Sequence, residues 1–133
     1  RRPPRSTLVP YKTLFRSSAG SALGTGAVVV IAEGTCMVEL LKRSSRFYYV
    51  ENCGQCTPCR EGTGWLYRLL QKITQGKGQE SDLTLLVDVA NRIEGNTICA
   101  FGDAAAWPVQ SFIEHYYSEF AYMINNHGKS IAA

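Results

Sequence analysis

Four cysteines carry the chemistry that this sequence can support. Cys53, Cys56 and Cys59 lie at two-residue intervals, and Cys99 follows after a gap of 39 residues. Three thiolates this close in the chain can wrap one face of a cubic iron–sulfur cluster, and a remote fourth thiolate can close the other side. The pattern therefore predicts a [4Fe–4S] site with four cysteine ligands.

Two other uses of these cysteines fit the spacing less well. Zinc knuckles usually pair two C-x2-4-C elements, whereas Cys99 has no second cysteine or histidine nearby. A zinc-stapled structural domain therefore remains the alternative from another functional class. A thioredoxin-like redox pair is disfavoured, because three cysteines in step lack a surrounding βαβ pattern. The fifth cysteine, Cys36, lies among apolar residues, and we expect it to be a packed thiol rather than a ligand.

Helices must position these cysteines. Hydrophobic periodicity and capping residues predict four helices, over about 35–49, 57–74, 81–95 and 108–128. The triplet then lies before the second helix, which Thr57 as N-cap and Pro58 as first residue would begin. Cys99 lies in the loop before the fourth helix, which we expect Pro108 to open. The predicted fold is mainly α, a four-helix bundle preceded by a buried strand over 26–32.

This placement suits a negatively charged group. Four thiolates and an oxidised cluster core carry a net charge of about −2, and a helix N-terminus offers unpaired N–H groups with a partial positive charge. Cys59, just inside the second helix, would lie there, and Gly54 would let the backbone turn closely around the cluster. Arg60 either adds positive field or is a solvated helix residue.

Charge and composition exclude several function classes. The net charge is +3, but residues 1–16 hold five of the 14 basic residues and no acid, which leaves 9 bases against 11 acids in the rest. We therefore expect no nucleic-acid binding. No apolar run approaches the roughly 18 residues of a membrane span. His115 and His127 have no visible nucleophile partner, and we expect Trp65 and Trp107 to pack in the core.

The first residues differ from the remainder. Residues 1–17 lack hydrophobic periodicity and resemble a translated sequencing-adapter artefact, with a natural disordered tail as the alternative. We expect no function there. The glycine-rich residues 20–26 precede their strand, whereas a dinucleotide fingerprint needs strand, loop and helix in that order, so we interpret them as a hairpin or domain-edge loop.

Four ordered segments resemble one known family, the NADH-binding flavoprotein of respiratory complex I (the F-subunit family of the bacterial NADH-quinone oxidoreductase). The resemblance covers roughly Ser18 to His127 and is carried by GSALGTGA at 20–27, ENCGQCTPCREGT at 51–63, IEGNTICA at 93–100 and GDAAAWPV at 102–109. One local departure is Asn52, where serine is more usual in the family.

The resemblance implies a fold, a ligand set and partners. Family members bind FMN and NADH in an N-terminal domain, followed by a ubiquitin-like domain and a helical bundle with one [4Fe–4S] cluster. By position the ligands are Cys53, Cys56, Cys59 and Cys99, and residues 18–34 would end the ubiquitin-like domain. Residues 35–128 would form the iron–sulfur domain and 129–133 a tail. The implied partners are other subunits of the peripheral arm, especially the small [2Fe–2S] subunit and the large multi-cluster subunit.

The resemblance also sets expectations for activity. The cluster would accept electrons from FMN, and the full-length protein would be part of an enzyme. This chain lacks the FMN and NADH domain, so we expect it to be inactive toward NADH by itself. The implied location is cytoplasmic, peripheral to the inner face of the cell membrane, or the matrix side in a mitochondrion. The diaphorase subunit of an NAD-linked hydrogenase or formate dehydrogenase shares these motifs and remains an alternative.

Overall fold

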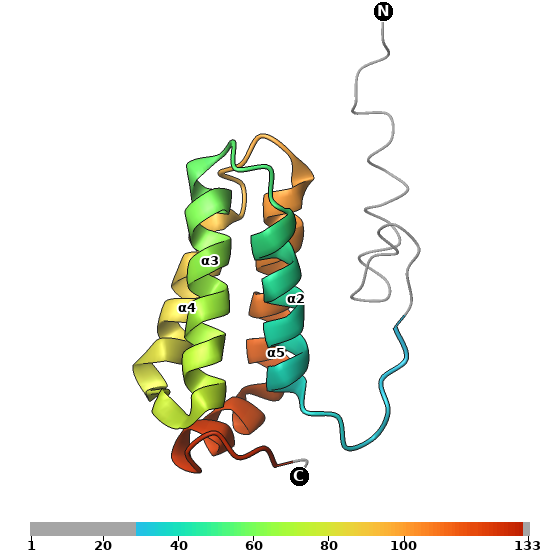
Figure 1. The fold of residues 1–133 in the computed structure, drawn as a ribbon, viewed down its shortest axis with the longest axis vertical. Helices are drawn as coiled ribbons and strands as arrows, with labels where there is room; N and C mark the ends of the chain where they lie inside the picture. The colour runs from blue at the N-terminus through green and yellow to red at the C-terminus, as the bar shows by residue number, and fades with distance from the viewer. Residues whose placement is uncertain (1–28, 132–133) are drawn as a thin grey trace, which may run out of the picture. The chain divides into compact units, whose positions relative to one another are not determined.

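Four helices form the described part of the chain, as Figure 1 shows. The computed structural model describes residues 29–131, of which residues 33–131 belong to one compact unit. The elements are α2 (Met37–Glu51), α3 (Thr57–Lys72), the π-helical turn η2 (Ile73–Lys77), α4 (Glu80–Ile93) and α5 (Ala100–Asn125). The prediction of a mainly α bundle is confirmed.

The helices pack as an antiparallel bundle. Helix α2 lies against α3 and α5, and α4 lies against the same two helices, so α3 and α5 occupy one diagonal (Figure 1). The apolar face of each helix is buried in a single core. Its fully buried side chains include Val38, Leu41, Leu66, Leu70, Leu86, Ile93, Val109 and Phe120. The α2–α3 and α4–α5 loops therefore meet at one end of the bundle.

Helix α5 begins eight residues earlier than the sequence indicated. Pro108 was expected to open this helix but lies inside it, and Cys99 is the N-cap residue. A proline inside a helix removes one backbone hydrogen bond. Here the alanine run 104–106 has high helix propensity, and two of its side chains are buried, which favours the longer helix. The consequence is that Cys99 lies directly at a helix N-terminus.

The other helix starts differ by a residue or two from expectation. Helix α3 takes Cys56 as its N-cap, so Thr57 and Pro58 are its first two residues. Helix α4 was expected to take Ser81 as its cap but starts from Gln79, through a capping box with Asp82. The carboxylate of Asp82 accepts the Gln79 N–H at 2.7 Å and lies 2.8 Å from the Lys72 ammonium, which ties α4 to the end of α3.

The expected strand is not found in its described part. Residues 29–32 are exposed and form no strand, and a strand is stable only when it pairs with other strands. The rest of that strand, the arm 1–17 and the glycine-rich loop 20–26 lie outside the described residues, as do residues 132–133. Within residues 29–131 the structure contains no helix long and apolar enough to cross a membrane.

Candidate metal centre

The four predicted ligands line one cavity at the loop end of the bundle. This cavity has a volume of about 140 Å³. Cys53 and Cys56 reach it from the α2–α3 loop, Cys59 from the first turn of α3, and Cys99 from the end of the α4–α5 loop. The structure thus brings together all four cysteines, although 39 residues separate the last two.

Two helix N-termini point at this cavity. Cys56 is the N-cap residue of α3 and Cys99 is the N-cap residue of α5. Cys59 lies in the first turn of α3 and is buried, whereas Cys53 and Cys99 are exposed. The first N–H groups of a helix carry a partial positive charge, so both helices stabilise negative charge held by these sulfurs. Anionic sulfur ligands are thereby favoured at this end of the bundle.

The other three cysteines lie close enough to Cys59 to affect its protonation. Burial raises the pKa of the Cys59 thiol above its ordinary value of 9.0, and the neighbouring Cys99, Cys53 and Cys56 raise it further by charge repulsion. Several thiolates in one small cavity repel each other and need a compensating cation. Metal binding supplies that charge and releases the thiol protons.

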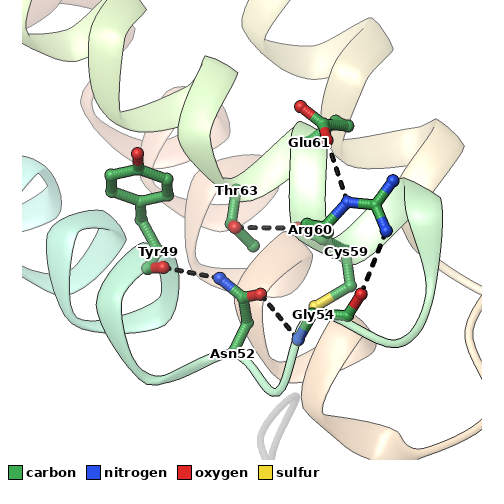
Figure 2. A network of polar contacts seen from close by, with 7 residues as sticks. All are labelled: Tyr49, Asn52, Gly54, Cys59, Arg60, Glu61 and Thr63. Carbon is green, nitrogen blue, oxygen red and sulfur yellow. Dashed lines mark hydrogen bonds and ion pairs between the residues drawn. The ribbon is translucent and has the colours of Figure 1, made fainter.

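The α2–α3 loop is held by side chains on both of its sides, as Figure 2 shows. The Asn52 amide donates to the carbonyl oxygen of Tyr49 at the end of α2, and its Oδ1 accepts the Gly54 N–H at 3.1 Å. Arg60 donates to the Gly54 carbonyl oxygen at 3.2 Å and pairs with Glu61 at 2.9 Å. Gly54 has a φ of +78°, a conformation that favours glycine. Arg60 therefore holds the loop by hydrogen bonding, in addition to carrying a positive charge.

The α4–α5 loop is held in a similar way. The Asn96 amide donates to the carbonyl oxygen of Arg92 at 3.2 Å, as Asn52 does to the end of α2. Asp103, in the first turn of α5, accepts the Gly95 N–H at 2.8 Å. The Trp107 indole N–H donates to Glu94 Oε1 at 2.6 Å. Both cysteine loops are thus fixed to the helices that they connect.

One hydrogen bond joins the two loops across the cavity. The backbone N–H of Ile98 donates to the Sγ atom of Cys56 over an N···S distance of 3.4 Å. Thr97, next to Ile98, donates from its hydroxyl to the Cys99 carbonyl oxygen at 2.9 Å. The segment that supplies Cys99 therefore also supplies a donor to a second ligand.

The cavity has room for a group larger than a single ion. Its volume of about 140 Å³ is several times the roughly 30 Å³ that one water occupies in the liquid. Among residues 29–131, no three cysteine, histidine or acidic side chains converge closely enough to hold one metal ion. A tetrahedral zinc site draws its four sulfurs to about 2.3 Å from one point. Four cysteine side chains around a cavity of this volume fit the donor set of an iron–sulfur cluster.

The residues outside the four proposed ligands agree with the sequence-based expectations only in part. Cys36 packs against the core, as predicted. Trp65 and Trp107 were expected to be core residues but are 53% and 40% exposed. Trp65 borders a surface groove between α3 and α4, and Trp107 bonds to Glu94. Sequence inspection missed the loop-holding roles of Glu94, Asp103 and Trp107, for which the pattern contains no short-range signal. Asn96 beside the end of α4 is a C-cap signal that could have been noticed.

Comparisons with known proteins identify the family of this chain. Residues 39–123 match the family described as the NADH-ubiquinone oxidoreductase-F iron-sulfur binding region. The chain is 47% identical over 114 residues to the NADH-quinone oxidoreductase F subunit of Rickettsia felis, covering 86% of this chain and 27% of that protein. It is also 47% identical over 111 residues to an NADH-quinone oxidoreductase F subunit of Rhizobium meliloti, covering 84% and 26%. The chain thus spans about a quarter of the length of these curated relatives.

Proposed function

Since this chain belongs to the family of NADH-ubiquinone oxidoreductase-F iron–sulfur binding regions, we propose that it holds one [4Fe–4S] cluster and acts as an electron-transfer module. The proposed ligands are Cys53, Cys56, Cys59 and Cys99. The observation that carries this proposal is the single cavity that all four side chains line. Four cysteine thiolates are the usual ligands of a [4Fe–4S] cluster.

The chain's own residues set the chemistry of the site. When bound, the cluster supplies one-electron redox chemistry. The N-termini of α3 and α5 favour the negative charge of four thiolates, and the Ile98 N–H donates to one of them. Asn52, Arg60 and Asp103 hold the two loops, so the ligands need little rearrangement. Loops held in this way would keep the four thiolates in place when the bound cluster gains or loses one electron.

The electron donor and acceptor lie outside this chain in our proposal. The relatives are named as NADH-quinone oxidoreductase subunits, which favours complex I over a hydrogenase or formate dehydrogenase as the parent enzyme. In that setting the cluster held by Cys53, Cys56, Cys59 and Cys99 would accept electrons one at a time from FMN bound in a separate domain of the full-length subunit. The acceptors are the small [2Fe–2S] subunit or the large multi-cluster subunit, on the inner, cytoplasmic side of the membrane. We expect no NADH oxidation by this chain by itself.

Single cysteine substitutions test the ligand assignment. The chain and its variants are reconstituted anaerobically with iron and sulfide, and bound iron and visible absorbance are measured. Alanine in place of Cys53, Cys56, Cys59 or Cys99 should abolish or degrade the cluster. Cys36→Ala is the matched control and should retain full iron, because this thiol packs against the core. Iron loss in Cys36→Ala, together with full iron in Cys99→Ala, would overturn the assignment.

A further inference from the structure

We propose that the Ile98 N–H bond to Cys56 raises the reduction potential of the bound cluster, and that Glu94 and Trp107 hold this donor in place. The inference rests on the proposed function, because it concerns the reduction potential of the cluster proposed at that same site. It concerns three residues that are not metal ligands: Ile98, Glu94 and Trp107.

The position of the Ile98 N–H is not explained by its side chain. The Ile98 side chain is 85% exposed, so core packing does not fix this residue. Its N–H nevertheless lies 3.4 Å from the Cys56 sulfur, which belongs to a different loop, 42 residues earlier in the chain. Contacts elsewhere in the α4–α5 loop must therefore set the direction of this donor.

Those contacts come from one face of α5. Trp107 Nε1 donates to Glu94 Oε1 at 2.6 Å, and Gln110 Nε2 donates to Glu94 Oε2 at 2.8 Å. Asp103, four residues before Trp107 and so on the same helix face, accepts the Gly95 N–H at 2.8 Å. The first turns of α5 thus hold the start of the loop, while Cys99 holds its end as the N-cap of the same helix. The segment between them contains Ile98.

The effect on the potential has a definite sign. Reduction adds one negative charge, part of which resides on the cysteine sulfurs. An N–H donor stabilises the more negative state more strongly, because hydrogen bonds to charged acceptors are the stronger ones. Hydrogen bonds to the sulfurs are among the factors that set cluster potentials. Loss of the Ile98 donor therefore shifts the potential to a more negative value.

The test uses the full chain and replaces neutral residues with neutral residues, so that no variant changes the net charge. Ile98→Pro removes the N–H directly, and Ile98→Val keeps it. Trp107→Phe keeps the aromatic ring but removes the indole donor to Glu94. Trp65→Phe is the matched control, because Trp65 lies in the α3–α4 groove and has no hydrogen bond to either loop among those of the described residues. Asp103 is left unchanged, since removing its charge would itself shift the potential. Each variant is reconstituted with iron and sulfide, its iron content is measured, and its midpoint potential is determined by EPR-monitored titration.

The expected result is a negative shift for Ile98→Pro and a smaller negative shift for Trp107→Phe, at unchanged iron content, with no shift in either control. An unchanged potential in an iron-loaded Ile98→Pro chain overturns the inference. If Ile98→Pro fails to load iron, Trp107→Phe decides, and an unchanged potential there overturns it too. An unsubstituted chain that takes up no iron overturns the proposed function as well, which distinguishes the two failures.

Discussion

Gly102 offers a quantitative test of how the Cys99 loop is packed. It is buried in the first turn of α5, where it contacts the loop residue Thr97, and both line the cysteine cavity. A Cβ atom at position 102 would lie 2.5 Å from Thr97 Cγ2 and 2.9 Å from Thr97 Cβ, and would also overlap Thr97 Oγ1. Contacts this short require the loop to move. Gly102→Ala is therefore expected to displace Thr97 and the segment leading to Cys99.

The magnitude follows from two opposing effects. Overpacking of this kind costs typically about 1–3 kcal/mol. Alanine is better than glycine in a helix by about 1 kcal/mol, which offsets part of that cost. We therefore expect Gly102→Ala to lower the free energy of unfolding by about 1 kcal/mol. Thr97→Ala alone should cost about 0.5–1 kcal/mol, because it removes the hydrogen bond to the Cys99 carbonyl oxygen.

The double variant separates the clash from other effects. With alanine at position 97 the overlapping Oγ1 and Cγ2 atoms are gone, and only the 2.9 Å contact between the two Cβ atoms remains. Urea unfolding of the apoprotein should then give a coupling free energy of about 1–2 kcal/mol between Gly102→Ala and Thr97→Ala, because most of the overlap is relieved. Single-variant effects that add within about 0.5 kcal/mol would refute the packing described for these two residues.

Three further outcomes are expected. Asp82→Ala should lower the urea midpoint by an amount equivalent to about 2 kcal/mol, because the buried carboxylate caps α4 and pairs with Lys72. Asp88→Ala should change the free energy of unfolding by no more than about 0.5 kcal/mol, because the pair of Asp88 with Arg92 is exposed. Equal losses of stability in the two variants would contradict this. The raised Cys59 pKa favours the protonated folded state, so the apoprotein should lose unfolding free energy as the pH rises above about 9, and Cys59→Ala should flatten that dependence. Gly76→Ala should destabilise more than Gly95→Ala: both have positive φ, but only Gly76 is crowded, with its added Cβ 2.7 Å from the His127 carbonyl carbon.

The sequence was most informative where short-range patterns carry structural meaning. Cysteine spacing identified the four cysteines that line the cavity together, and apolar periodicity located the four described helices to within a few residues, apart from the start of α5. Cys36 was correctly expected to pack, since its neighbours are apolar. These features depend on residues close together in the chain.

The features that the sequence analysis predicted wrongly or missed involve either two competing local preferences or contacts between residues far apart in the chain. At Pro108 the preference of proline for a helix start competed with the alanine run before it, and burial of those alanines favoured the longer helix. Trp107 was expected in the core because it is large and apolar, yet its indole N–H bonds to Glu94, 13 residues earlier. The Ile98 donor to Cys56 spans 42 residues. No local pattern signals which backbone N–H will meet which sulfur.

Anaerobic reconstitution of the unsubstituted chain with iron and sulfide, in the presence of competing zinc, tests the central claim most directly. Bound iron, sulfide and zinc are counted per chain, and EPR spectra are recorded after dithionite reduction. The account predicts about four irons and four sulfides per chain with the signal of a reduced [4Fe–4S] cluster. One tightly bound zinc per chain, with no sulfide and no EPR signal, would contradict it and favour a zinc-stapled structural domain.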